Sequence, residues 1–339
     1  MLRGDDRTWA LAERIGWASE TAAADRASEA LRLARLAVRL AEGCPGPEAW
    51  CLRVRGWCEP ILANALRVGG DLPASAAQFA SADELWRQGE GGDPAGLLDG
   101  LRRLDLKASL FMYQEEHFEE AQALLDEALK GTTDDQARAR LLIKKATALE
   151  ISGDYDAALG VLDQAEPLIG EQSGSRNLFL HHFMKAVNLC HLDLFETGSV
   201  LVPVVEQLAA DSGNELDQVR VRWLRGRTLV GLGRRAEALA ALTEVRAYLH
   251  AERIAYDFAL VSLEVAVAHL EQGQLPRVQE LAEEMLWIFH DQGVHKEALA
   301  ALALFCRAAR AGEVELAWTR RLIKYLYRAQ YSPGLRFEP

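Results

Sequence analysis

The feature that most constrains this chain is a two-part helical unit that recurs along the sequence. In its clearest copy, Leu141 to Leu168, apolar and small residues recur at spacings of four and three, which is typical of one buried helix face. Gly153-Asp154 interrupts that stripe, and a second stripe of the same kind follows. Two amphipathic helices joined by so short a turn must fold back antiparallel. The second stripe consists of Tyr155, Ala158, Leu162 and Ala165.

The same pattern returns before and after this copy, and its spacing is regular. Each copy has a small residue near the middle of its first helix, and the successive steps are 37, 40, 40 and 40 residues. An earlier copy around Ala63 precedes these by 46 residues, with the glycine-rich loop from 89 to 94 taking up the difference. Such a period predicts a repeat array that grows in one dimension. The small residues are Ser109, Ala146, Ala186, Gly226 and Ala266.

The unit resembles the tetratricopeptide repeat (TPR) family. The family signature is a small residue in the first helix, a Gly-Asp-Tyr turn, and small and large apolar residues along the second helix. The resemblance covers about Trp57 to Tyr331. The period exceeds the family's usual 34 residues, as in long-repeat bacterial TPR proteins and the helical sensor domains of bacterial transcription regulators. The resemblance implies an all-α fold, a right-handed α-α superhelix of about six to eight helical hairpins. The matching residues are Ala146, Gly153, Asp154, Tyr155, Ala158, Leu162 and Ala165.

The two ends of the chain depart from the repeat pattern, which predicts three regions. Residues 1–46 are expected to form an N-terminal helical hairpin that caps the array. Residues 47–312 form the TPR-like repeat array. Residues 313–339 are a C-terminal capping helix and tail, since a solenoid needs a polar outer face at its end.

The composition limits the classes of partner. The formal net charge is −12 and the sequence pI is near 5.3, which argues against nonspecific nucleic-acid binding and against a polybasic membrane anchor. No apolar run approaches the roughly 20 residues that span a bilayer, and we expect no signal peptide. The five cysteines are an odd number in a long chain, which favours reduced thiols. These features predict a cytoplasmic protein.

The resemblance implies that residues of the first helix of each repeat line a concave face that binds a polypeptide. The inward positions are unusually apolar, so either the interior packs on itself or the groove accepts a hydrophobic segment. Arg220, Trp223 and Arg227 form the best single site, because arginine and tryptophan are frequent at interface hot spots and two arginines on one helix face suit a carboxylate. A solvated helix face with one buried tryptophan is the alternative. The partner-binding candidates are Arg103, Tyr113, Arg140, Phe183, Arg220, Trp223 and Arg227.

Other clusters point to structure rather than chemistry. Cys44, Cys51 and Cys58 lack the spacing of zinc ligands, and prolines and Gly56 argue against one helix through all three. The adjacent His181 and His182 point in different directions and do not suit one metal ion. The chain has no nucleophile elbow, phosphate loop or dinucleotide fingerprint. We therefore predict a protein that is not an enzyme and needs no cofactor or metal.

Two functions remain open on the sequence. The first is a protein-protein interaction scaffold or adaptor that binds a polypeptide through its groove, within a bacterial regulatory or defence assembly. The alternative is a regulatory sensor whose solenoid binds a peptide or small ligand and passes the signal to a separate effector or transcription regulator. The positions used by chaperone-binding family members hold apolar residues or threonine here, so that activity is not implied.

Overall fold

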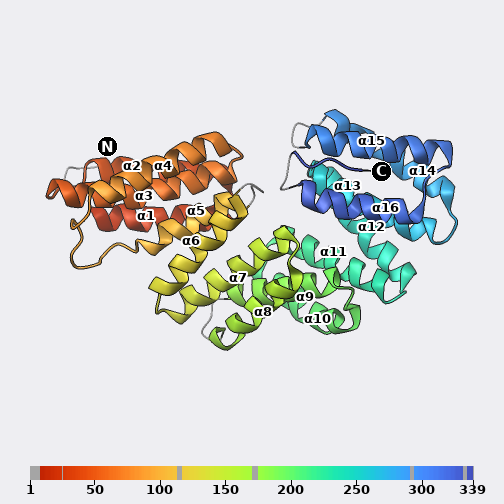
Figure 1. Ribbon diagram of the computed structural model, residues 1–339, viewed down its shortest axis with the longest axis horizontal. Coiled ribbons are helices and arrows are strands. Elements are labelled where there is room, and N and C mark those ends of the chain that lie inside the picture. The colour runs from red at the N-terminus through yellow and green to blue at the C-terminus, as the bar shows by residue number, and fades with distance from the viewer. Residues whose placement is uncertain are drawn as a thin grey trace. The chain divides into compact units, whose positions relative to one another are not determined.

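The computed structural model describes residues 8–24, 26–112, 117–169, 175–290, 294–330 and 334–338. Across these ranges the chain forms sixteen α-helices and no strand, which confirms the predicted all-α class. Successive helices pair as antiparallel hairpins, and the chain divides into two compact units, Met1–Thr133 and Asp134–Pro339 (Figure 1). The predicted regions, which end at residues 46 and 312, follow the repeat pattern, whereas the two units follow the contacts within the fold. The predicted division therefore stays a prediction.

Unit 1 contains the first six helices, which form three hairpins. A hydrophobic core joins α1 to α5, and Trp57, Ile61 and Phe79 are among its buried large side chains. The helices are α1 (Trp9–Ala22), α2 (Ala27–Glu42), α3 (Glu48–Val68), α4 (Leu72–Gln88), α5 (Leu101–Phe111) and α6 (Phe118–Gly131).

Unit 2 contains the remaining ten helices. Its last helix, α16, packs against α13 as well as against its own hairpin partner α15 (Figure 1). The helices are α7 (Asp135–Ser152), α8 (Tyr155–Ala165), α9 (Ser175–His191), α10 (Phe195–Ser212), α11 (Glu215–Gly231), α12 (Arg235–Ala251), α13 (Ala255–Leu270), α14 (Leu275–Glu284), α15 (Lys296–Ala311) and α16 (Leu316–Ala329). Two 3₁₀ helices follow α8 and α14, η3 (Glu166–Leu168) and η4 (Leu286–His290).

The Gly-Asp turn of the clearest repeat shows how the sequence ends one helix and starts the next. Gly153 follows α7 with a φ of +88°, a left-handed conformation that glycine adopts without a steric penalty. The side chain of Asp154 then caps α8 by accepting a hydrogen bond of 3.2 Å from the backbone N–H of Ala157. These two residues therefore reverse the chain within one turn, as predicted.

The small residues of the repeat lie where helices approach closely. Ala146, Ala186 and Ala266 are completely buried. At Gly226, an added Cβ atom would lie 2.6 Å from the buried Leu242 side chain. The 40-residue period therefore reports a packing requirement between the two helices of each hairpin.

All five cysteines are free thiols and four of them are buried, and one detail of their placement differs from the prediction. Cys51 and Cys58 both lie within α3, and Cys44 precedes it. Gly56 does not interrupt this helix. It provides a close contact, since a Cβ atom there would lie 2.8 Å from the backbone nitrogen of Trp86.

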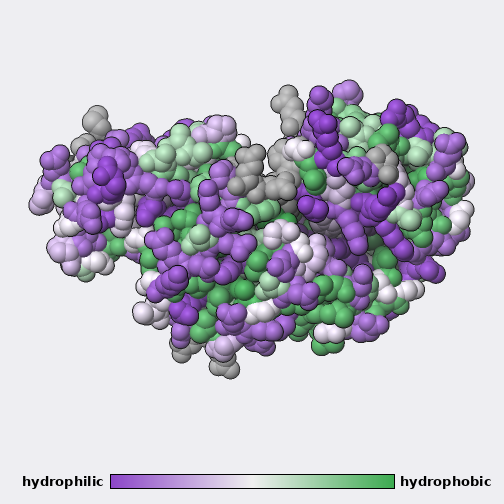
Figure 2. Space-filling model, viewed as in Figure 1, coloured by the Kyte–Doolittle hydropathy of each residue, from purple (hydrophilic) through white to green (hydrophobic). Residues whose placement is uncertain are grey.

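Figure 2 shows hydrophilic residues over most of the visible face of each unit, with smaller hydrophobic areas between them. Exposed large hydrophobic side chains are few among the described residues, and Val200 is the most exposed at 72%. None of the helices described is both long enough and apolar enough to cross a membrane.

Candidate functional site

A pocket in unit 2 is lined by the first helices of four successive hairpins and by the last helix. Its volume is about 200 Å³. We call it the unit 2 pocket. Its lining side chains come from α7, α9, α11, α13 and the C-terminal end of α16, and they are Glu150, Phe183, Met184, Val187, His191, Arg220, Trp223, Leu224, Arg227, Asp257, Leu260, Tyr327 and Gln330.

Helical spacing brings the lining residues together. Phe183 and Val187 lie four residues apart on α9, so both side chains occupy one face of that helix. Arg220, Trp223 and Arg227 form the equivalent stripe on α11 at spacings of three and four. The structure thus gathers four of the seven predicted partner-binding residues around one pocket.

A buried charge pair links Arg227, one of the lining residues, to Glu264 of α13. The Arg227 Nε atom lies 3.4 Å from a Glu264 oxygen, and the two side chains are only 18% and 11% exposed. The indole N–H of Trp223 donates a hydrogen bond of 2.5 Å to the other oxygen of Glu264. Burial raises the pKa of Glu264, while Arg227 and hydrogen bonds from Trp223 and Tyr327 oppose that rise. These contacts hold the carboxylate in place.

Tyr327 brings the last helix into this network. The Arg227 guanidinium carbon lies 5.1 Å from the centre of the Tyr327 ring, within the range of a cation–π contact. The Trp223 ring lies 6.3 Å from the same ring, measured between centroids. The unit 2 pocket is therefore closed on one side by α16, a helix far from α11 in the sequence.

A histidine adjoins the charge pair. His191 stacks on Tyr155 with ring centroids 4.4 Å apart, and it meets the Tyr327 ring edge-on at 5.6 Å. Its Nε2 atom lies 3.2 Å from an oxygen of Glu150. Burial lowers the pKa of His191, and the contact with Glu150 opposes that effect. The lowered pKa favours a neutral imidazole between two tyrosine rings.

Arg220 is the accessible cation at the edge of the pocket. Its side chain is 48% exposed and lies 3.8 Å from Asp217, a buried carboxylate that also pairs with Arg176. Asp257 lies on the neighbouring helix, and burial raises its pKa against the influence of Arg220 and a hydrogen bond with Gln330. Arg227 is mostly buried against Glu264, so Arg220 is the more accessible of the two pocket arginines.

The other predicted residues lie elsewhere. Arg103 belongs to unit 1, where it pairs with Asp83 and lies over the Trp86 ring. Arg140 is half-buried on α7 and is not part of the pocket lining. Tyr113 lies outside the described residues.

Sequence reasoning missed several members of the site. His191 and Glu264 lie on helices that were predicted to line the groove, so their helical register was a usable signal. Tyr327 and Gln330 lie on α16 or at its end, which was predicted only to cap the array. Their presence depends on the packing of α16 against α13, and no local pattern in the sequence reports that contact.

Comparisons with known proteins place the fold. No protein-family model matches the chain, and no curated protein matches it. Among solved structures, the chain is similar to a Rap protein complexed with competence and sporulation factor, with a TM-score of 0.70, 12% identity, and coverage of 95% of this chain and 88% of that chain. It is also similar to the apo form of RapI, with a TM-score of 0.56, 12% identity, and coverage of 94% and 98%. The protein therefore has a helical-repeat fold like that of the Rap proteins.

Proposed function

We propose that the protein is a non-catalytic regulator or adaptor that binds a polypeptide segment in the unit 2 pocket. The observation that carries this proposal is the convergence of Phe183, Val187, Arg220 and Trp223 from two successive hairpins on one accessible pocket. Aromatic and arginine side chains beside apolar ones are the composition of interface hot spots. A ligand that lies across successive hairpins would contact both stripes.

The size of the pocket favours a polypeptide over a free small molecule. Its volume of about 200 Å³ is smaller than typical small-molecule pockets, which range from roughly 300 to 1,000 Å³. A pocket of this size suits one or two side chains of a longer ligand. The remainder of such a ligand would lie along the neighbouring inner helices.

The lining defines the chemistry of the ligand. Phe183, Val187 and Leu260 offer an apolar surface, and Arg220 offers a half-exposed guanidinium beside it. A segment that places an acidic group, either a side chain or a terminal carboxylate, next to a large apolar side chain would use both. The similarity to a Rap protein complexed with a factor supports binding as the role of this fold.

The ionisable groups of the pocket support binding rather than catalysis. Glu264 is held by Arg227, Trp223 and Tyr327 together, so it is engaged as a structural acceptor. Asp257 has a hydrogen bond with Gln330 and lies near enough to Arg220 to be stabilised by its charge. We therefore assign Glu264 and Asp257 a role in the shape and polarity of the pocket.

A random-peptide display library panned against the full chain tests the proposal. Enriched peptides are then measured by fluorescence anisotropy against Arg220→Glu and against Arg225→Glu. Arg225 is a matched control, because it lies on the same helix outside the pocket, is 49% exposed, and also has a weak ion pair, 3.3 Å from Glu206. We expect Arg220→Glu to weaken binding at least about tenfold and Arg225→Glu to leave it within about twofold.

Two results would count against the proposal. Peptides that bind both variants and the parent equally would remove the unit 2 pocket from the binding site. A library that yields no enriched peptide would argue against polypeptide binding altogether and direct the search to small ligands by thermal shift.

The sensor function has one specific observation in its favour. Because Tyr327 of α16 lines the pocket, a ligand there contacts both the inner helices and the last helix. Such a ligand would stabilise the contact of α16 with α13. Hydrogen exchange of the α16 amides with and without an enriched peptide tests this, and slower exchange confined to α16 and the pocket helices would favour the sensor over a passive scaffold.

A further inference from the structure

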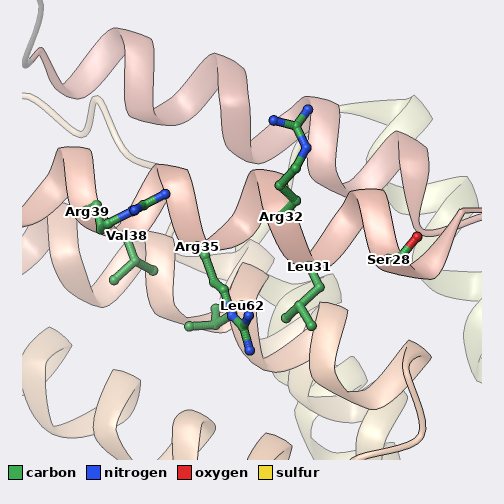
Figure 3. Close-up of a pocket in the computed structure, with 7 residues that line it drawn as sticks. All are labelled: Ser28, Leu31, Arg32, Arg35, Val38, Arg39 and Leu62. Atoms are coloured by element: carbon green, nitrogen blue, oxygen red, sulfur yellow. The ribbon is translucent and has the colours of Figure 1, made fainter. Parts of the chain in front are cut away.

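A second groove lies on unit 1, between α2 and α3. Its volume is about 580 Å³. We call it the unit 1 groove. Figure 3 shows Leu31, Arg35, Val38 and Leu62 directed to the same side of α2. The complete lining is Ser28, Leu31, Arg32, Arg35, Val38, Arg39 and Leu62.

The groove carries cations that the fold does not neutralise. Arg32 forms two hydrogen bonds with Glu29, of 2.7 and 2.6 Å, and points away from the apolar side chains (Figure 3). Arg35 and Arg39 are exposed, and neither has an ion pair or hydrogen bond among the described residues. None of the lining residues is acidic. The groove is thus a positive site on a chain whose formal net charge is −12.

The apolar part of the groove is continuous with these cations. Leu31 and Val38 lie seven residues apart on α2, two turns along one face, and Leu62 joins them from α3. All three side chains are half-buried, so each keeps apolar surface in contact with water. A partner that covers them gains the hydrophobic contribution of that surface.

We propose that the unit 1 groove docks an acidic amphipathic helix of a partner protein. Arg35 and Arg39 lie four residues apart, about 6 Å along the helix axis, which matches carboxylates at positions i and i+4 of a facing helix. Arginine pairs with carboxylates through two parallel hydrogen bonds, and the apolar stripe of the same helix would cover Leu31, Val38 and Leu62.

Other anions fit the groove less well. A free phosphate or another small anion would leave the three apolar side chains uncovered. Nucleic acid binding depends on many phosphate contacts, whereas this groove offers only two unpaired arginines beside an apolar surface. An acidic helix uses the charges and the apolar surface together. This proposal does not depend on the function proposed for unit 2.

A display library of helical peptides, with solvent-facing positions randomised to acidic, neutral and basic residues, tests the docking. It is panned on the full chain and counter-selected on Arg35→Glu/Arg39→Glu. We expect enriched peptides to have carboxylates at i and i+4 beside an apolar stripe. Binding by fluorescence anisotropy should weaken at least about tenfold in the counter-selected variant. The matched control is Arg307→Glu/Arg321→Glu, which makes the same change in net charge at exposed residues of unit 2.

Each other outcome would overturn the proposal. Equal weakening by the control variant would mean that net charge, rather than the groove, binds the peptide. Enrichment of neutral or basic helices, or no enrichment, would exclude an acidic helix as the occupant. Equal competition by a scrambled, non-helical peptide of the same composition, or by inorganic polyphosphate of equal charge, would identify a general anion site. Circular dichroism of the variants shows whether each has kept its helical content.

Discussion

The unit 2 pocket and the unit 1 groove both contain arginines, but the two sites use them differently. In the unit 2 pocket, Arg227 is mostly buried against Glu264, and Trp223 and Tyr327 share the same carboxylate. In the unit 1 groove, Arg35 and Arg39 extend into solvent without an acidic partner among the described residues. The same residue type therefore stabilises the fold in one place and leaves charge available in the other.

The difference separates structural charge from charge that can recognise a ligand. A buried arginine that loses its acid, or an acid that loses its arginine, is left with an uncompensated charge in a poorly solvated place. An exposed arginine has water as its partner and contributes little to stability. Substituting Arg227 should therefore lower the stability strongly and affect binding little. Substituting Arg35 or Arg39 should weaken binding and leave the stability almost unchanged.

The largest effect is expected at the buried pair. Arg227→Met leaves Glu264 buried without its cation, and we expect the free energy of unfolding to fall by about 3–5 kcal/mol. Adding Glu264→Gln removes the stranded charge but keeps an acceptor for the Trp223 N–H, so the double variant should recover at least half of the loss. Denaturant unfolding followed by circular dichroism measures both.

Burial, rather than the unit in which a residue lies, should decide the size of this effect. Arg102 in unit 1 is 13% exposed and pairs with Glu20 and Asp105, which are 8% and 1% exposed. Arg102→Met should therefore be as destabilising as Arg227→Met. A loss below about 1 kcal/mol at either position would contradict the distinction between buried and exposed arginines.

The next effect concerns the hydrogen bond to the same carboxylate. Trp223→Phe removes the indole N–H that donates to Glu264, and we expect a loss of about 1.5–3 kcal/mol, the range for a hydrogen bond to a charged group. In a Glu264→Gln background the same substitution should cost less, because the acceptor is then neutral. A double-mutant cycle isolates this coupling, and equal costs in both backgrounds would show that Trp223 acts only through packing.

The contrast between the two sites also explains what the sequence could and could not predict. The stripe of Arg220, Trp223 and Arg227 was predictable because helical periodicity fixes which residues share a face. Whether each arginine is paired with an acid was not predictable. Glu264 lies 37 positions beyond Arg227 and contacts it only because α11 and α13 pack together. Helical periodicity predicts the face on which a side chain lies, whereas its ion-pair partner depends on tertiary contacts.

The fold was easier to predict from the sequence than the site, because it depends more on local requirements. The turn at Gly153-Asp154 and the small residue at Gly226 are local or hairpin-level requirements, and each is visible in the sequence. The placement of Tyr327 in the pocket depends on the contact of α16 with α13. An apolar face on a short helix indicates that the helix packs against another element, but it does not identify that element.

A smaller effect is expected from pH, and it should be confined to unit 2. Burial lowers the pKa of His191, so the unfolded chain binds a proton more readily than the folded one. Stability from this residue is present above the unfolded pKa of about 6.5 and is lost as pH falls through the lower folded value. The groups facing His191 are Glu150 on α7, Tyr155 on α8, Arg227 on α11, and Tyr327 and Lys324 on α16.

His191→Gln should reduce the fall in melting temperature between about pH 7.5 and 5.5, because glutamine takes up no proton. His117→Gln is the matched control, since the side chain of His117 in unit 1 is 37% exposed, compared with 10% for His191, and also lies close to a glutamate, Glu120. If both variants lose the same share of the pH dependence, the burial of His191 is not its cause.

The smallest effect on stability is expected at the unit 1 groove. Arg35→Ala and Arg39→Ala remove exposed side chains with no ion pair among the described residues, so each should change the free energy of unfolding by no more than about 0.5 kcal/mol. Alanine is also the better helix former, which offsets part of any lost packing in α2. A loss above about 1 kcal/mol would mean that these arginines contribute to the fold of unit 1, as Arg227 does in unit 2. A near-zero change, together with weaker binding of an acidic helix, would show that their charge is available for recognition.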